Sequence, residues 1–282
     1  MALRVLHYLS TTRTEAGGTV RAAFDLCTAL AQRGHHVTFV TSDAADAPEE
    51  WRAGDAGAPR LVEIPAPALP GDVYTRAGLA PLRSLIAEHD CAHVHGVWQY
   101  SSVQVCRVAR ALGKPYFVTV HGMLDDWCMS QRGLKKRLYL KLVGRRWLEG
   151  AARVHMTVQA EQDQARKWFP RGRGVVIPYV VDLTPFQALP GPEMARERFP
   201  VLASGAPSVL FLSRIHEKKN PETLLRAMRL LKQRGIRATL IVAGTGDDRY
   251  VESVKALTRV LGLTEKDVAF VGLVTGDLKL SL

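Results

Sequence analysis

The chain has 282 residues, and its hydrophobic content of 47% is enough to bury one large core or two ordinary ones. Lysine and arginine outnumber the acids by 38 to 27, so the formal net charge is +11. That charge favours an anionic partner: nucleotide phosphates, an acidic lipid surface or nucleic acid. The sequence has no apolar run near the roughly 18 residues of a membrane span, and its N-terminus lacks a signal-peptide pattern. We therefore expect a cytoplasmic protein.

In the first part of the chain, short β-branched runs alternate with longer segments of helical period, which is typical of parallel strands joined by crossover helices. The first strand is predicted at 4–9, and Gly17 and Gly18 open a helix that Gly34 ends. Further strands are predicted at 36–41, 60–64, 91–95, 116–120, 153–157 and 174–177. The pattern predicts an α/β fold with one complete doubly wound domain.

Two segments of this domain carry weak signals. The acidic, alanine-rich stretch 43–57 and the proline-rich stretch 65–72 are predicted to be surface loops. The cysteines are far apart and have no zinc-ligand spacing, so we expect reduced thiols, mostly in the core, and no metal site. A disulfide pair is the alternative. The chain has four cysteines: Cys27, Cys91, Cys106 and Cys128.

A second series of elements follows a proline-rich break at 179–193. Its strands are predicted at 208–213, 238–243 and 268–272, with helices at 221–234 and 248–261. Three strands leave an open sheet with a long exposed edge, which natural domains normally cover. We therefore expect the chain to stop midway through a second domain.

Several charges gather at the strand-to-helix turn of the stretch FLSRIHEKKNPETLL, where packing does not require them. Arg214, Lys218 and Lys219 come just before Asn220 and Pro221, which have the chemistry of an N-cap and a first helical position. Unpaired N–H groups at a helix N-terminus, together with these cations, predict a phosphate or diphosphate site. The alternative is a solvated run of charges, and Lys218 is the residue that fits it best.

The same stretch resembles the nucleotide-diphosphate signature of GT-B glycosyltransferases of family 4. Other segments match that family in the expected order across essentially the whole chain: AGGTVRAAFDL, HVHGVW, FVTVHGML, VIPYVVDLTPF, LIVAGTGDD and KDVAFVGLV. The resemblance implies two Rossmann-like doubly wound parallel sheets, the second incomplete. Residues 1–185 would form the acceptor-side domain, and residues 186–282 part of the nucleotide-sugar domain.

The resemblance also implies an activity. A retaining, metal-independent hexosyltransferase of this kind, without a cofactor, moves a sugar from a nucleotide-diphosphate donor to a glycan or lipid-linked acceptor. Arg214 and Lys219 match the pair that neutralises the diphosphate leaving group in place of a divalent ion. Asn220 follows them in the donor-binding turn. Gly17 and Gly18 match a glycine turn that lets the backbone approach the donor phosphate, although an ordinary tight turn would also explain them.

Three residues at the ends of first-domain strands are further candidates. His121 follows a predicted strand, and by resemblance it contacts the donor sugar near the reacting carbon; the alternative is a histidine that satisfies a polar group of the core. His95 and Trp98 end another strand and would line the acceptor pocket, with packing as an equal alternative.

Gly244 and Gly246 resemble the family's nucleotide-side glycine turn. A dinucleotide fingerprint is disfavoured, because Arg249 occupies the position of its third glycine and the first strand is not followed by G-x-G-x-x-G. A nicotinamide oxidoreductase is therefore not expected.

The segment 132–150 interleaves basic residues with leucines. Such an amphipathic helix can lie on the inner face of an anionic membrane, and many relatives in the family act on lipid-linked acceptors. The same pattern also fits a helix that packs through its leucines and has a solvated basic face. Both interpretations remain open at the level of sequence.

Two departures from the family pattern are visible. Tyr179 and Val180 stand where a tight-turn pair such as Asn-Gly is usual, so the hinge or donor contacts differ there. The acidic E-x7-E element that holds the donor is expected just beyond Leu282, so transfer by this chain would be impaired. A non-catalytic truncated fragment is therefore one rival hypothesis. A basic nucleic-acid-binding protein is another, although no aromatic platform supports it.

Overall fold

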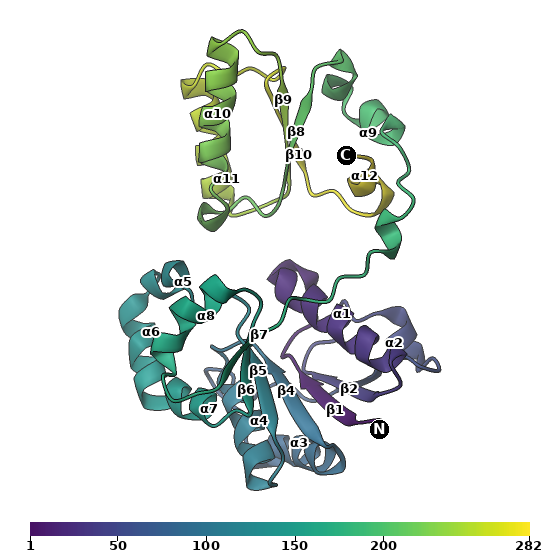
Figure 1. The fold of residues 1–282 in the computed structure, drawn as a ribbon, viewed down its shortest axis with the longest axis vertical. Coiled ribbons are helices and arrows are strands. Elements are labelled where there is room, and N and C mark those ends of the chain that lie inside the picture. The colour runs from purple at the N-terminus through teal and green to yellow at the C-terminus, as the bar shows by residue number, and fades with distance from the viewer. The chain divides into compact units, whose positions relative to one another are not determined.

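The computed structural model describes the backbone of all 282 residues and every side chain except those of Ala16 and Pro185. The chain forms two compact units, Met1–Asp182 and Leu183–Leu282, each with its own parallel sheet (Figure 1). The expected domain boundary, between residues 185 and 186, falls in the 3-10 turn Thr184–Phe186 that follows this division.

The first unit is built on a seven-stranded sheet with the order β3-β2-β1-β4-β5-β6-β7, and every pairing is parallel. The strands predicted from the β-branched runs are confirmed. Their bounds are β1 Arg4–Tyr8, β2 His36–Thr41, β3 Arg60–Glu63, β4 Cys91–His95, β5 Tyr116–Thr119, β6 Arg153–Met156 and β7 Gly174–Val176.

Helices connect these strands, as parallel pairing requires. They are α1 Gly18–Gln32, α2 Glu49–Ala53, α3 Arg76–Glu88, α4 Tyr100–Ala111, α5 Asp126–Ser130, α6 Gly133–Tyr139, α7 Arg145–Glu149 and α8 Gln159–Ala165. A π-helical segment, Leu140–Gly144, joins α6 to α7, so residues 133–149 form one helical run.

Alternation along β1 separates the two faces of this sheet. Leu6 and Tyr8 are buried in the larger core, which includes side chains of α3, α4 and α7. Val5 and His7 lie on the opposite face, the face that α1 covers. The sheet therefore has an aliphatic side and a side on which histidines are buried.

The prediction of a surface loop for 43–57 is wrong in part, because α2 forms there and buries Trp51. The Trp51 ring lies 5.0 Å from that of Phe24 and 5.4 Å from that of Phe39, in the smaller core between α1 and β2. One aromatic side chain thus anchors a segment whose other residues, apart from Pro48 and Arg52, are small or acidic. The stretch 65–72 is an irregular, mostly exposed loop, as predicted.

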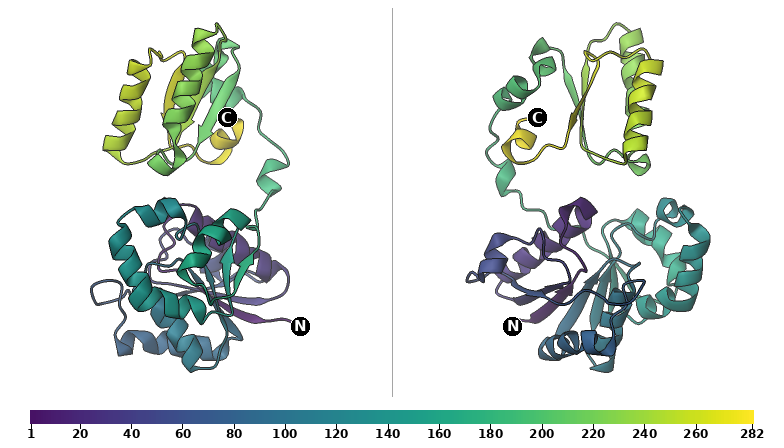
Figure 2. Two further views of the ribbon diagram at one scale, coloured as in Figure 1. Left: turned by 60° about the vertical axis from the view of Figure 1, so that its left-hand side comes forward. Right: turned by 180° about the vertical axis from the view of Figure 1, so that it is seen from behind.

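The second unit contains a three-stranded parallel sheet with the order β10-β9-β8. Its strands are β8 Ser208–Leu212, β9 Thr239–Ala243 and β10 Val268–Gly272, and its helices are α9 Glu193–Arg198, α10 Pro221–Gln233, α11 Asp248–Val260 and α12 Gly276–Ser281. Figures 1 and 2 show α10 and α11 against one face of the sheet, with α9 and α12 paired on the other side. The central strand β9 is buried along its whole length.

All four cysteines are free thiols, and Cys27 and Cys106 are buried, as expected. None of the described helices combines the length and the apolarity needed to cross a bilayer. The fold is thus two parallel α/β units, and the carboxyl edge of each sheet is where polar side chains gather.

Candidate active site

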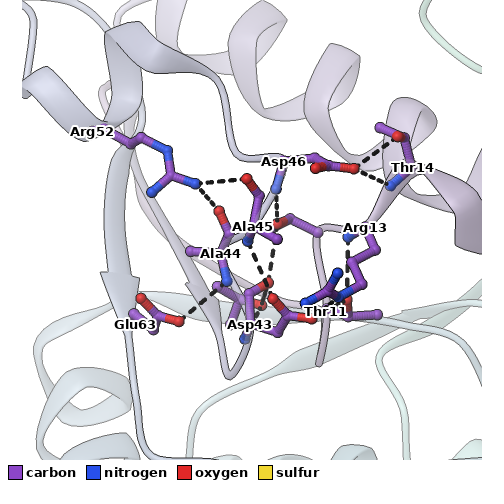
Figure 3. A network of polar contacts seen from close by, with 11 residues as sticks. Thr11, Arg13, Thr14, Asp43, Ala44, Ala45, Asp46, Arg52 and Glu63 are labelled. Atoms are coloured by element: carbon purple, nitrogen blue, oxygen red, sulfur yellow. Dashed lines mark hydrogen bonds and ion pairs between the residues drawn. The ribbon is translucent and has the colours of Figure 1, made fainter.

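The loop between β1 and α1 is held by carboxylates of the loop that follows β2 (Figure 3). Arg13 Nε donates to Asp43 Oδ2 over 2.7 Å, and Thr11 Oγ1 donates to the same oxygen over 3.0 Å. Asp46 accepts bonds of 2.8 Å from both the backbone N–H and the hydroxyl of Thr14. Two neighbouring strand ends are thereby tied together immediately before Gly17.

These contacts favour the ionised carboxylates. The Arg13 guanidinium is the largest cause that lowers the pKa of Asp43, and the Thr14 backbone N–H is the largest for Asp46. Asp46 is exposed and the Asp43 side chain is 33% exposed, so solvent screens both groups and their bonds fix the shape of the loop more than they stabilise the fold.

The two glycines of this loop have different structural needs. Gly17 has φ of 98°, a backbone conformation that side chains with a Cβ rarely adopt, and it occupies the N-cap of α1. Gly18 is the first helical residue, and a Cβ added there would meet no atom within 4 Å. The fold therefore explains Gly17, whereas it leaves Gly18 without a structural reason.

Strand register brings four histidines and a threonine onto one face at the carboxyl edge of the first sheet. His7 of β1 pairs with His93 of β4, and Thr119 of β5 pairs with His95 and with His155 of β6. His7 and His95 are 0% and 1% exposed. Nothing in the periodicity of single strands foretold this gathering, because it depends on which strands are neighbours.

One row of hydrogen bonds runs through the predicted residues His95 and His121. His7 Nδ1 lies 3.1 Å from His95 Nε2, and His95 Nδ1 lies 3.0 Å from His121 Nε2. His121 Nδ1 then lies 2.5 Å from the hydroxyl of Tyr179. Both ring nitrogens of His121 are thus occupied by protein groups, and His95 is an interior member of the row.

A second row lies beside the first. His93 Nε2 is 2.7 Å from Thr119 Oγ1, which is 2.9 Å from His155 Nδ1, and His155 Nε2 is 2.7 Å from the carbonyl oxygen of Ile177. An apolar cavity of about 320 Å³ adjoins this face, and His7, His93, His155 and Tyr179 contribute to its lining together with α1.

Burial keeps these imidazoles uncharged. Desolvation lowers the pKa of His7 and that of His121 to about 3, and it lowers the pKa values of His93 and His95 well below the ordinary value. The pKa of the Tyr179 phenol is raised by the same cause. At neutral pH these four imidazoles are therefore neutral donors and acceptors.

His7, His93 and His95 are also spaced as three metal ligands could be, with one nitrogen from each within 4.8 Å of the others. Both nitrogens of His95 and one nitrogen of each of the other two are already hydrogen-bonded to protein partners. A metal bound by all three would have to break at least one bond of His95 and draw the nitrogens closer together. We therefore interpret the cluster as a hydrogen-bonded network.

Hydrogen bonds to Glu161, a residue not singled out from the sequence, stabilise the turn at His121. His121 has φ of 51°, a conformation uncommon for residues other than glycine. The buried Glu161 carboxylate accepts the Gly122 N–H over 2.5 Å and both the N–H and the hydroxyl of Thr157 over 2.7 and 3.0 Å. No sequence signal marks it, because its partners come from the β5 and β6 ends.

Trp98 is a packing residue in this structure. Its ring lies 5.7 Å from that of Tyr139, and the Lys136 ammonium lies 5.1 Å from its centroid. Lys136 also donates to the carbonyl of Cys128 over 2.5 Å. Trp98 thus joins the α6 helix to the loop after β4, which corresponds to the packing alternative.

In the second unit, Arg214 and Lys219 lie in the loop that leads from the end of β8 to α10, and both are exposed. Between them Ile215 is 2% exposed and anchors the loop in the core. Among the described residues neither cationic side chain has a hydrogen-bond or ion-pair partner. The protein therefore leaves two positive charges unneutralised at the carboxyl edge of the second sheet.

Asn220 takes the N-cap position of α10, as predicted, but in a different way from the expected one. Its backbone is left-handed, with φ of 48° and ψ of 55°, and its side chain makes no capping bond. Pro221 follows at the start of the helix. Asparagine adopts this left-handed backbone geometry more readily than most residues, which explains its presence in the turn. The first helical N–H groups of α10 are left without a side-chain cap.

Gly244 and Gly246 bring the end of β9 against the loop that carries Arg214. A Cβ on Gly244 would stand 1.9 Å from the carbonyl oxygen of Ser213, and one on Gly246 would stand 2.0 Å from that of Ile215. Ile215 N–H donates to the carbonyl of Thr245 over 2.8 Å. These glycines are thus required by backbone packing within the second unit.

The helical run 133–149 has two apolar faces. Leu140, Trp147 and Leu148 are buried in the core, whereas Leu134 and Leu142 are 86% and 70% exposed. Leu138 is also exposed, at 55%. The two sequence interpretations therefore apply to different residues, since one face packs inward and three leucines face outward.

Comparison with known proteins gives two matching family models. Residues 17–180 match the glycosyl transferase 4-like domain, and residues 206–281 match the glycosyl transferases of group 1. No curated protein matched the sequence.

Several solved structures have the same fold. Anabaena Alr3699/HepE, solved in complex with UDP and glucose, has a TM-score of 0.69 at 16% identity, over 97% of this chain and 70% of that one. A glycosyltransferase from Rickettsia africae has a TM-score of 0.66 at 17% identity, over 99% and 70%. WaaG, a glycosyltransferase of lipopolysaccharide biosynthesis, has a TM-score of 0.61 at 17% identity, over 95% and 70%.

Proposed function

The chain belongs to the glycosyl transferase 4-like family, and from this premise we propose that it is a retaining, metal-independent glycosyltransferase that uses a nucleotide-diphosphate sugar. The two unneutralised cations at the end of β8 are the observation that carries the proposal. A glycan or a lipid-linked molecule is the proposed acceptor.

In the proposed reaction, positive groups of the protein lie where negative charge develops on the leaving group. The bond between the anomeric carbon and the β-phosphate oxygen breaks, and its electron pair stays on the leaving diphosphate. The oxygen of the acceptor hydroxyl forms the new glycosidic bond, and its proton passes to the leaving diphosphate. Arg214 and Lys219 would stabilise the departing diphosphate, as would the N-terminal N–H groups of α10, which no side chain caps.

The choice of the first donor to test follows from the similar structures. Anabaena Alr3699/HepE has been solved with UDP and with UDP-glucose. At 16–18% identity this likeness shows the fold alone. It supports a uridine diphosphate sugar as the starting probe in a panel that also contains GDP- and ADP-sugars.

Calorimetry with this panel tests donor binding, and single-residue variants test the site. Arg214→Ala or Lys219→Ala should each lower the transfer rate on the order of 10²-fold. Lys218→Ala is the matched control, since it removes a charge from the same loop and should have little effect. The proposal fails if no nucleotide sugar binds, or if Arg214→Ala behaves like Lys218→Ala.

We also propose that the outward face of 133–149 rests on an anionic membrane, which would suit a lipid-linked acceptor. Leu134, Leu138 and Leu142 follow one another at helical i, i+4 spacing and are all exposed. Lys135 and Lys141, neighbours of these leucines, are exposed as well. Apolar insertion combined with basic charge is what binds interfacial helices to anionic lipid.

Sedimentation with phosphatidylglycerol vesicles tests this second proposal, with phosphatidylcholine vesicles for comparison. The double variant Leu134→Ser, Leu138→Ser should lose binding to the anionic vesicles. Val260→Ser, at a site 81% exposed in α11, should retain it. Equal binding of both variants would contradict the membrane contact.

A further inference from the structure

The two hydrogen-bonded rows of the first sheet end on different chemical groups. The row from His93 ends on the carbonyl of Ile177, and the row from His7 ends on the hydroxyl of Tyr179. A carbonyl only accepts hydrogen bonds, whereas a phenol hydroxyl can donate or accept. The donor–acceptor direction of the hydrogen bonds is therefore fixed in the row that ends on Ile177. In the row that ends on Tyr179, that direction depends on what the two terminal groups bind.

The Ile177 carbonyl fixes each proton of the row that begins at His93. A neutral imidazole donates from one nitrogen and accepts at the other, so His155 must donate from Nε2 to Ile177 and accept at Nδ1. Thr119 then donates to His155 and accepts from His93 Nε2–H. His93 and His155 are both Nε2–H tautomers.

In the row that begins at His7 the three tautomers depend on one another. If His121 donates from Nδ1 to Tyr179, its Nε2 must accept from His95 Nδ1–H, and His95 must accept from His7 Nδ1–H. If Tyr179 donates instead, all three rings carry the proton on Nε2. A mismatch would set two N–H groups or two lone pairs against each other in the buried interior, which is costly.

The protein does not determine which of these two states is occupied. The Nε2 atom of His7 is buried and has no hydrogen-bond partner among the described residues, so this end is unsatisfied in both states. The other end is the hydroxyl of Tyr179, a residue that is 37% exposed. Only a group outside the row can therefore choose its direction, and only at Tyr179.

We propose that His7, His95 and His121 share one tautomer and change it together, and that a substrate oxygen paired with the Tyr179 hydroxyl sets the direction. The ring nitrogens of His121 are both engaged. Tyr179 is then the residue through which this row contacts a sugar, as donor in one state and as acceptor in the other. The role of Tyr179 rests on the proposed function, whereas the common tautomer does not.

Nitrogen-15 spectra of the histidine side chains test the common tautomer directly, at about pH 8 and thus above the ordinary histidine pKa. Two residues are internal references. His89 donates from Nδ1 to the carbonyl of Leu85, and His155 donates from Nε2 to that of Ile177. We expect His7, His95 and His121 to show one common tautomer, or the same proportion of the two tautomers, relative to these references. Different tautomers within the three would overturn the proposal.

A variant that cuts the row tests the coupling. In His95→Phe the tautomer proportions of His121 should no longer equal those of His7. His36→Gln, at an exposed histidine of β2, should leave the proportions of all three residues unchanged and equal. If His7 and His121 keep equal proportions in His95→Phe, the coupling is contradicted. The spectra of the natural sequence decide the common tautomer even if this variant does not fold.

Kinetics test the role of Tyr179. Tyr179→Phe keeps the ring and removes the hydroxyl, and should lower kcat/KM about tenfold, the value of one or two neutral hydrogen bonds. Tyr100→Phe, which loses a hydroxyl bonded to Arg107 on the surface of α4, is the control. An unchanged kcat/KM in Tyr179→Phe overturns its role. If the natural sequence transfers no sugar, that role falls with the proposed function, and the spectra still decide the common tautomer.

Discussion

The carbonyl oxygen of Ile215 lies 2.0 Å from the point where a Cβ on Gly246 would stand, so the ends of β8 and β9 touch through their backbones. An isolated parallel bridge joins the same two residues. This contact fixes the loop that carries Arg214, and it connects a glycine with no chemistry of its own to the proposed donor site.

Gly246→Ala should therefore disturb the second unit and its ligand together. The new methyl group must push Ile215 away, at a cost of about 1–3 kcal/mol for overpacking, and the displaced loop should weaken UDP binding. Thermal unfolding and calorimetry with UDP measure the two effects. Gly235→Ala is the comparison: its Cβ would stand in open space, so it should lose only about 1–2 kcal/mol, because of its φ of 72°, and should keep UDP binding. Unchanged stability of Gly246→Ala would contradict the close approach.

The glycine pair before α1 allows a test that separates fold from function. Gly18→Ala should keep or raise stability by up to about 1 kcal/mol, because a helical alanine replaces a more flexible residue without a clash. Gly17→Ala should lose about 1–2 kcal/mol, because its φ of 98° disfavours a Cβ. If the donor phosphate approaches Gly18, transfer should fall in Gly18→Ala despite its intact fold. Full activity would remove Gly18 from the proposed site.

Glu161 is expected to be a positioning residue for the His121 turn. In Glu161→Gln one carboxylate oxygen becomes an NH₂ group, which meets either the Gly122 N–H or the donors of Thr157. The unsatisfied donor should cost about 1–3 kcal/mol and should speed hydrogen exchange at the Gly122 amide. Exchange measured by NMR checks this, with the exposed Glu88→Gln as control. Equal exchange in both variants would show that the His121 turn does not depend on the Glu161 carboxylate.

The loop network of Arg13 and Asp43 predicts an acid-dependent contribution to stability. The folded-state pKa values of Asp43 and Asp46 lie below their ordinary value of 3.8, so their contribution is present above that value and is lost as pH falls through the folded pKa. Asp43→Asn should therefore show a smaller fall in Tm between about pH 5 and pH 3.

Asp55→Asn is the control for this pH series, since Asp55 is an exposed carboxylate outside the network. Its Tm should fall with pH as steeply as that of the natural sequence. A parallel fall for Asp43→Asn would mean that the bonds seen in Figure 3 contribute nothing to the acid response.

Most of the fold follows from local patterns. Each predicted strand is present, because runs such as residues 36–41 and 239–243 are β-branched, apolar and bounded by turn residues. Trp51 shows the limit of such patterns. A single buried ring anchors α2 within an alanine-rich stretch, and the partners that make it a core residue, Phe24 and Phe39, are remote in sequence.

The candidate site was predictable where it depends on sequence neighbours. Arg214, Lys219 and Asn220 lie in one loop, and their arrangement follows from a strand end and a helix start. The histidine rows were not predictable, since His7, His121 and His155 meet only through the order of the strands. Glu161 was missed for the same reason, because its function is defined by the backbone of a neighbouring strand end.

Both rows of hydrogen bonds terminate within the short segment from Ile177 to Tyr179, directly after β7. His155 of β6 and His121, which follows β5, thus bind this segment at two points, one through its backbone and one through a side chain. The linker toward the second unit therefore begins after Tyr179 and not at Val176, the end of the last strand. The histidines of the candidate site therefore also attach the start of the linker to the first sheet.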